Sequence, residues 1–142
     1  NTNRQLALIN ASYQALTNKT LPLTGEGNLV ESFDACPYPI ASHDHLSLFN
    51  YANTAALALF KTSLNDIIGV HSTVSAPDFA QQERELLLAT VTQHGYSENY
   101  QGTRTTFDGT LFQIHNATVW NIIDESGHYH GQAVLILEHT YL

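Results

Sequence analysis

The spacing of hydrophobic positions changes along the chain, from a helical period near its start to the alternation of β-strands in its last third. Residues 4–17 carry one narrow apolar stripe at intervals of three and four, which predicts an amphipathic helix with Thr2 as its cap. The stripe consists of Leu6, Ile9, Tyr13 and Leu16. A stripe this narrow has to lie on another surface, either the chain's own sheet or a second subunit.

The next part of the chain predicts short elements separated by turns. Residues 21–39 are rich in proline and glycine, which indicates an irregular connection with a short helical turn at 29–33. Residues 38–43 follow as an extended segment, which we expect at a sheet edge because proline is tolerated there. Residues 47–51 then form a second short strand.

Capping residues predict helices in the middle of the chain. Asn53 is a good N-cap for a helix over 54–61, and 63–66 (Ser-Leu-Asn-Asp) resembles a capping box. A longer helix opens at 75–78 and runs to about residue 93, where Gly95 stops it. Its expected apolar face comprises Phe79, Leu86, Leu87 and Val91.

The last third predicts three antiparallel strands. Residues 98–107, 110–123 and 131–141 alternate or are strongly apolar, as strands do. Asp-Gly at 108–109 is a strong hairpin signal, and a second turn covers 124–127. The order is therefore a helix, two strands, a helical middle and a three-stranded meander.

The long strand over 110–123 has one face that should point into the core, because it has the larger apolar volume. That face comprises Phe112, Ile114, Asn116, Thr118, Trp120 and Ile122. Asn116 and Thr118 would then be buried polar groups, which either bond to neighbouring groups and water or face a ligand cavity between sheet and helices. A β-bulge would exchange the two faces and make Gln113 and His115 the candidates instead.

Arg104 is the only cation in the predicted sheet, and it shares a strand face with Tyr100. If that face points inward, Arg104 could hold a carboxylate bidentately. Otherwise Arg104 is solvated or pairs with Glu98 or Asp108. Gln132 on the last strand could reach the same pocket. The candidate ligand-binding residues are therefore Tyr100, Arg104, Asn116, Thr118, Trp120 and Gln132.

Charge and composition exclude several classes of partner. The 142 residues include 5 basic and 13 acidic side chains, for a formal charge of −8, and the basic ones are scattered along the sequence. Nucleic acids and anionic membranes both require clustered cations, so we expect neither as a partner. The single cysteine, Cys36, forms no intrachain disulfide, and with no visible signal peptide or membrane span we expect a cytoplasmic protein.

The eight histidines include two His-x-His pairs, at 43–45 and 128–130, which could suggest zinc. No cysteine or glutamate completes either pair at a typical spacing, so we interpret them as solvated loop histidines and predict no metal site. Catalytic motifs such as G-x-S-x-G and H-E-x-x-H are absent. We therefore expect no enzyme and no catalytic residue; a small α+β enzyme using a histidine and an acid is the lowest-ranked alternative.

The order of elements resembles the PAS fold, and particular motifs resemble its MEKHLA branch, which is found in bacterial stand-alone proteins and in some plant transcription factors. The motifs that carry this resemblance lie at 12–17 (Ser-Tyr-Gln-Ala-Leu-Thr), 50–53 (Asn-Tyr-Ala-Asn), 83–87 (Glu-Arg-Glu-Leu-Leu), 117–120 (Ala-Thr-Val-Trp) and 131–133 (Gly-Gln-Ala). Their order and spacing, from about residue 6 to residue 137, carry more weight than any one motif.

The resemblance implies an α+β fold with a PAS-like five-stranded antiparallel sheet, helices on one face and a preceding amphipathic helix. We expect one domain over 1–142, with the first helix within 1–19 and the core at 38–139. The implied role is a sensory module that binds an unidentified small molecule and forms a homodimer through its first helix or its sheet. A ligand-free interaction domain is the alternative.

Two PAS cofactors are disfavoured by the sequence. Photoactive flavin-binding members carry a reactive cysteine before the long helix, where this chain has 71–77 (His-Ser-Thr-Val-Ser-Ala-Pro), without cysteine. Haem would need a rigidly placed histidine near the long helix, and the candidates are His71 before it and His94 after it. We therefore predict no cofactor.

Overall fold

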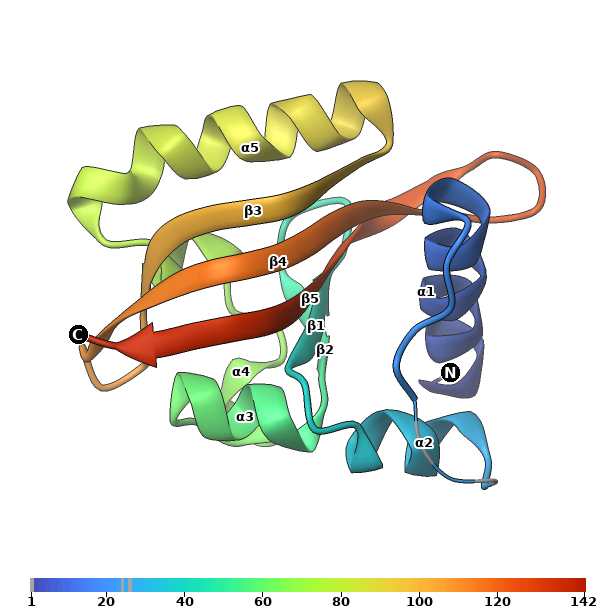
Figure 1. Ribbon diagram of the computed structural model, residues 1–142, viewed down its shortest axis with the longest axis horizontal. Helices are drawn as coiled ribbons and strands as arrows, with labels where there is room; N and C mark the ends of the chain where they lie inside the picture. Colours follow the sequence, from blue (N-terminus) through green and yellow to red (C-terminus); the bar gives the residue numbers. More distant parts are fainter. Residues whose placement is uncertain (1, 24, 26) are drawn as a thin grey trace.

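A five-stranded antiparallel sheet organises the computed structural model, which describes residues 2–23, 25 and 27–142 (Figure 1). The strands are β1 (Ile40–His43), β2 (Phe49–Ala52), β3 (Tyr96–Thr105), β4 (Leu111–Ile123) and β5 (Tyr129–Tyr141). Their spatial order is β2-β1-β5-β4-β3, so the two short early strands add to the edge of the C-terminal meander. The predicted α+β class, the five-stranded antiparallel sheet and the N-terminal helix are confirmed.

The helices lie close to their predicted positions. They are α1 (Thr2–Thr17), α2 (Leu29–Ala35), α3 (Thr54–Phe60), α4 (Leu64–Ile67) and α5 (Gln81–His94), with 3₁₀ turns at Ser72–Ser75 and Asp78–Ala80. The cap at Asn53 is confirmed, because its side chain accepts the Ala56 N–H at the start of α3. Ser63 accepts the Asp66 N–H in the same way at the start of α4.

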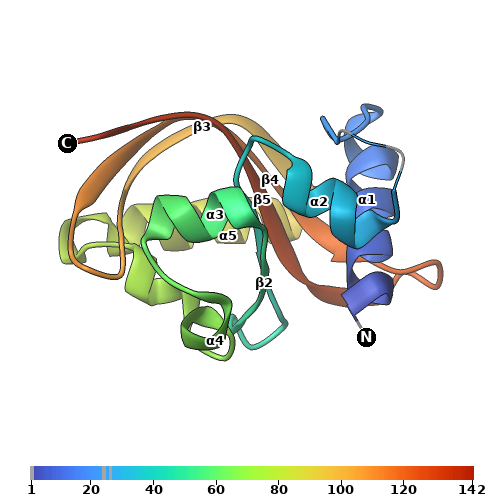
Figure 2. The same cartoon turned by 90° about the horizontal axis from the view of Figure 1, so that it is seen from below.

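Each face of the sheet packs against its own hydrophobic cluster. Neighbouring residues of β1 and β5 alternate between the two clusters: Ile40 and Leu135 belong to one, Ala41 and Ile136 to the other. This alternation places the clusters on opposite faces of the sheet. One face packs on α1 and α2 and the other on α3 and α4, and Figure 2 shows α1 and α3 on opposite sides of β5.

The apolar stripe of α1 lies on the chain's own sheet. Leu6, Ile9 and Tyr13 are buried in the cluster that contains Trp120 of β4. The Trp120 indole N–H donates to the Ile9 carbonyl at 3.2 Å, and the Trp120 ring meets Tyr13 edge-on with centroids 4.8 Å apart. Of the two surfaces left open by the sequence, the structure uses the intramolecular one.

A β-bulge near residues 115–116 changes which side of β4 faces inward. The pairing with β5 shifts on both sides of Asn116, so Ile114 and Ala117 belong to the same cluster although three residues separate them. The predicted inward face is therefore correct for Phe112 and Ile114 and wrong from the bulge onward. Gln113 and His115, the alternative candidates, lie on the outer face, because the bulge follows them instead of preceding them.

Two further expectations about faces and edges are wrong. β1 lies inside the sheet, between β2 and β5. Pro39, which has no N–H to donate, stands just before the strand, and its carbonyl accepts the Ile136 N–H. The proline therefore does not confine β1 to a sheet edge. Of the residues expected on the apolar face of the long helix, Phe79 and Leu86 are 71% and 65% exposed, whereas Val91 is buried together with Arg84. The chain between Ser72 and Ala80 forms 3₁₀ turns, so α5 begins only at Gln81 and turns a different face to the sheet.

Candidate functional site: a cavity between the sheet and α5

A cavity of about 90 Å³ lies between the inner face of the sheet and α5, and all five strands contribute to its wall. Its apolar lining includes Phe49, Phe60, Leu87, Leu88, Ile114, Val119 and Ile136. Its polar lining comprises Ser42, His43, Ser72, Ser75, Arg84, Tyr100, Arg104 and Gln132. A mostly apolar pocket with a few convergent polar groups is the usual character of a small-molecule site.

The structure brings together half of the residues that the sequence singled out. Tyr100, Arg104 and Gln132 line the cavity. Asn116, Thr118 and Trp120 do not: Asn116 is half-buried at the bulge, and Thr118 and Trp120 are buried on the α1 side of the sheet. The bulge is the physical reason, since it turns every later side chain of β4 to the opposite face.

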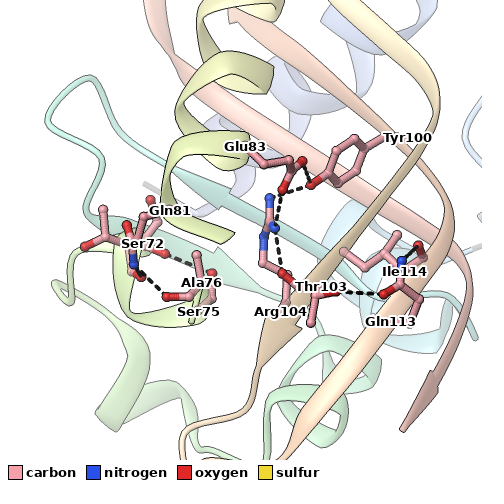
Figure 3. Close-up of polar contacts among 11 residues, drawn as sticks. Ser72, Ser75, Ala76, Gln81, Glu83, Tyr100, Thr103, Arg104, Gln113 and Ile114 are labelled. Atoms are coloured by element: carbon pink, nitrogen blue, oxygen red, sulfur yellow. Dashed lines mark hydrogen bonds and ion pairs between the residues drawn. The ribbon is translucent and has the colours of Figure 1, made fainter. Parts of the chain in front are cut away.

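Arg104 of β3 is buried and pairs with Glu83 of α5, as Figure 3 shows. The Arg104 Nη1 donates to Glu83 Oε2 at 3.1 Å, and Nη2 donates to the Tyr100 hydroxyl oxygen at 2.7 Å. Tyr100 in turn donates its hydroxyl proton to the other oxygen of Glu83. The three side chains thus close a ring that ties α5 to β3, and neither partner proposed for Arg104 from the sequence, Glu98 or Asp108, is used.

The backbone of β3 leaves room for this ring. At Gly102 a β-carbon would overlap the Tyr100 hydroxyl, so glycine lets the tyrosine lie along the strand toward Arg104. Burial raises the pKa of Tyr100, with the Glu83 carboxylate acting in the same direction against the Arg104 charge. Tyr100 therefore stays protonated and can donate its hydrogen bond at neutral pH.

A second polar network runs from β1 to α5. His43 Nε2 lies 3.2 Å from Gln132 Oε1, and the Gln132 amide nitrogen donates to the Leu88 carbonyl at 3.3 Å and to Asn121 Oδ1 at 3.1 Å. A carbonyl only accepts, so the Gln132 nitrogen must face Leu88 and its oxygen must face His43. His43 therefore carries its proton on Nε2, and its Nδ1 accepts from the Ser72 hydroxyl, 3.2 Å away.

Gly131 brings β5 close enough for this network. Its φ is +130°, and a β-carbon there would lie 1.9 Å from the His43 carbonyl oxygen. Any other residue would push β5 away from β1 and separate His43 from Gln132. The glycine of the 131–133 motif thus has a packing role beside the cavity.

His43 is buried and polar-bonded, so the expectation that it is a solvated loop histidine is wrong. Its position at the end of β1, inside the sheet, accounts for this. Burial lowers the pKa of His43; Arg84 and His71 act in the same direction, against the Gln132 hydrogen bond and the Asp44 charge.

Acidification should destabilise the protein through His43. Its folded pKa lies below the unfolded value of about 6.5, so between these values the unfolded chain binds more protons. The contribution of neutral His43 to stability is complete above about pH 6.5 and is lost as the pH falls toward its folded pKa. Urea unfolding should be measured above and below pH ~6.5. The free energy of unfolding should fall less on acidification for His43→Gln than for the wild type.

The control for this experiment is His45→Gln, because His45 is an exposed histidine two residues away. It should lose as much stability on acidification as the wild type. Equal losses for both variants and the wild type would show that another group dominates the acid response.

Arg84 of α5 is the main cavity residue that the sequence analysis missed. It is 6% exposed, and its Nη2 donates to the Ser72 hydroxyl. Burial and the nearby Arg104 charge both lower the pKa of Arg84. A signal was available, because Arg84, Leu88 and Val91 share one helical face at intervals of four and three.

The size and lining of the cavity bear on the cofactors that PAS-like folds suggest. At about 90 Å³ it is smaller than the ~150 Å³ that accommodates benzene, so in this conformation it does not accommodate the three-ring system of a flavin. Cys36, the single cysteine, is buried near the Pro22 carbonyl and is not among the lining residues. His71 and His94, the two histidines considered as haem ligands, are exposed and do not line the cavity.

Histidines and carboxylates are not gathered into a metal centre within the described ranges. Residues 2–23, 25 and 27–142 contain no group of three or more His, Cys, Asp or Glu side chains suited to a metal. His130 lies 2.8 Å from Asp124, but neither lines the cavity; the cavity histidine, His43, bonds to Gln132 and Ser72. Within the same ranges, no helix has the length and hydrophobicity needed to cross a bilayer.

Known structures with the same fold are PAS domains. One from Colwellia psychrerythraea superposes with a TM-score of 0.68 at 15% identity, covering 79% of this chain and 92% of its own. A PAS domain of a LuxR-family transcriptional regulator from Burkholderia thailandensis, in complex with ethanol, gives 0.59 at 18% identity, covering 79% and 95%. The Vibrio cholerae VqmA dimer, a LuxR-type receptor, gives 0.60 at 20% identity, covering 80% and 49%.

Comparison at the level of sequence identifies the family. A search of curated proteins finds no match. The model of the MEKHLA domain matches residues 3–141, nearly the whole chain. The chain therefore belongs to the MEKHLA domain family, whose sheet and helices here have the PAS architecture.

Proposed function

We propose that this domain is a non-enzymatic sensory module that binds a small molecule in the cavity between the sheet and α5. The observation that carries the proposal is the cavity itself, in which buried polar side chains from β1, β3, β5 and α5 converge on an otherwise apolar space. The PAS-like fold supports the sensory role, and the ethanol complex of the Burkholderia thailandensis domain supports a ligand of few atoms.

The helix α5 is the element that would register the ligand. It is tied to the sheet by Glu83, which bonds to Arg104 and Tyr100, and by its Leu88 carbonyl, which accepts from Gln132. Each of these contacts borders the cavity. A molecule bound there would contact α5 and the sheet together and bias the position of the helix, as a two-state sensor requires.

Self-association is a second part of the proposal. The α1 stripe is buried within the chain, so a second copy would have to use a different surface, such as the outer sheet face with exposed His115 and Thr140. The dimeric VqmA receptor supports this idea. The exposed Phe79 in the 3₁₀ turn before α5 and the exposed Leu86 on α5 instead favour the alternative, a ligand-free domain that docks another protein.

A cavity-filling variant tests the proposed ligand site. Ala41 lies on the inner face of β1 and lines the cavity, so Ala41→Leu should occupy much of that space. We expect the free energy of unfolding to change by no more than about 1 kcal/mol, because the added atoms fill a cavity. Thermal shifts induced by ethanol, propanol and other small probes should disappear, and native mass spectrometry should show no copurified molecule.

The matched control is Ala58→Leu, at an exposed position of α3. It should respond to the probes as the wild type does. If the wild type binds none of the probes and copurifies with nothing, the ligand-free interaction domain is the better account.

A further inference from the structure

Two buried arginines line the cavity, and only one of them has a carboxylate partner in the described part of the chain. Arg104 pairs with Glu83 at 3.1 Å. Arg84 is 6% exposed, and no Asp or Glu oxygen of the described residues lies within 4.0 Å of its nitrogens. Its hydrogen-bonding partner is the neutral hydroxyl of Ser72.

The rest of the Arg84 guanidinium is available to a ligand. Nε and Nη1 make no hydrogen bond to the described residues. Among the described residues, Tyr51 Oη is the single fully buried side-chain polar atom without a hydrogen-bond partner. The unbonded Nε and Nη1 of Arg84 are therefore not fully buried. Since the side chain borders the cavity, these N–H groups can be reached from it.

A buried cation without a counter-charge is costly, so proteins pair such groups. Glu83 offsets Arg104 by a direct ion pair, whereas the Glu85 carboxylate acts on Arg84 from more than 4.0 Å away and forms no ion pair with it. A monoanion bound against Arg84 would supply the missing charge. Nη2 carries a second N–H besides the one that donates to Ser72, and together with Nη1 or Nε it forms a fork that can hold a carboxylate through two parallel hydrogen bonds.

We propose that the ligand of this cavity is a short-chain monocarboxylate whose carboxylate is held by Arg84 and whose alkyl chain lies against the apolar wall. This inference rests on the proposed function and names the ligand class for the same site. The apolar part of the lining includes Phe60, Ile114 and Ile136, whose side chains offer nothing to a second charged group.

The size and lining of the cavity select within the class of anions. About 90 Å³ accommodates a molecule of a few non-hydrogen atoms. A phosphate dianion would bring more charge than the single unpaired arginine offsets, and its oxygens would meet apolar groups at Phe60 and Ile114. A monocarboxylate with a chain of two to four carbons satisfies both the charge and the apolar wall.

Calorimetric titration of the full chain with sodium propionate, at constant ionic strength, tests the proposal. Propionamide has the same shape without the charge, and sodium phosphate, sodium chloride and propanol serve as the other arms. We expect propionate to bind about ten- to a hundredfold more tightly than propionamide, because charge-assisted hydrogen bonds to Arg84 are lost with the amide. Propionate should also raise the melting temperature.

Arg84→Met is the decisive variant, because methionine fills similar space without charge. It should lose propionate binding about ten- to a hundredfold, while the ligand-free protein melts at the same or a higher temperature, since an uncompensated buried charge has been removed. If Arg84 had a purely structural role, the Arg84→Met protein would instead melt at a lower temperature and would still bind propionate more tightly than propionamide. Arg4→Met, at an exposed position of α1, is the matched control and should behave as the wild type.

Arg84→Lys provides a second test in case the Arg84→Met protein does not fold. It keeps the positive charge and loses the planar guanidinium fork. It should bind propionate with intermediate affinity. Equal affinity for propionate and propionamide, or unchanged propionate binding in Arg84→Met, would overturn the proposal, as would phosphate or chloride binding without propionate binding. Propanol binding alone would overturn it and leave the proposed function standing, whereas no binding by any probe would overturn both.

Discussion

Replacing Trp120 by alanine should lower the free energy of unfolding by about 3–5 kcal/mol. Trp120 is fully buried between the sheet and α1, with its ring against Tyr13 and its indole N–H on the Ile9 carbonyl. The variant would leave a large void under α1 and remove the indole hydrogen bond to the Ile9 carbonyl. Equilibrium urea unfolding measures the loss.

The same variant tests whether Trp120 contributes to the cavity or only to the core under α1. Because it lies on the α1 face and does not line the cavity, folded Trp120→Ala protein should bind small molecules as the wild type does. Asn116→Ala is the control at the bulge, half-buried, and should cost about 1 kcal/mol or less. A Trp120 variant that keeps its stability and loses ligand binding would place this side chain in the ligand site after all.

The packing of α1 also affects how self-association can be studied. Deleting residues 1–19 would remove Leu6, Ile9 and Tyr13 from the core and expose Trp120. A change in the sedimentation of this truncated chain would therefore reflect loss of folding as well as any loss of self-association. Sedimentation of the full chain, with substitutions at the exposed His115 or Thr140, addresses assembly without disturbing the core.

Asn53→Ala should have the second large effect, a loss of about 3–4 kcal/mol in the free energy of unfolding. The fully buried Asn53 side chain accepts the N–H groups of Ile40 and Ala56, each at 2.9 Å. Its amide nitrogen donates to the carbonyls of Phe33 and Tyr38, at 2.9 and 3.0 Å. Alanine would leave all four groups without this partner, at the junction of β1, α2 and α3.

Two comparisons make the Asn53 result specific. Asn28→Ala removes an exposed N-cap, whose oxygen accepts the Glu31 N–H, and should cost about 1 kcal/mol. Asn53→Asp keeps the two accepted bonds but turns a carboxylate oxygen toward the Phe33 and Tyr38 carbonyls, so it should lose at least as much stability as Asn53→Ala when ionised. Equal losses for Asn28→Ala and Asn53→Ala would show that Asn53 acts as a cap and nothing more.

Local signals account for what was predicted correctly. The cap at Asn53, the turn at 108–109 and the alternation in the last third each depend on residues close in sequence. Such patterns place helices and strands without any knowledge of their partners. The order of elements then suffices to indicate the PAS-like sheet, which the family match supports.

Three of the six candidate residues were placed on the wrong face of the sheet for one physical reason, a single bulge at Asn116. Strand periodicity places a side chain only relative to its neighbours, so one extra residue reverses every later assignment. Thr118 and Trp120 moved to the α1 face in this way, and Val119 and Asn121 took their place on the inner face. Pairing with β5, not any property of β4 alone, decides where the bulge falls.

The sequence by itself determined the fold class, the caps and turns, and the inclusion of Tyr100, Arg104 and Gln132 among the residues of interest. Tertiary structure alone decided that Glu83 pairs with Arg104, that His43 is buried against Gln132, and that Arg84 borders the cavity with no carboxylate of the described residues within 4.0 Å. These contacts join residues that are 12 to 89 positions apart, as Arg84 to Ser72 and His43 to Gln132 show. Burial and charge compensation depend on such distant partners, and no local pattern encodes them.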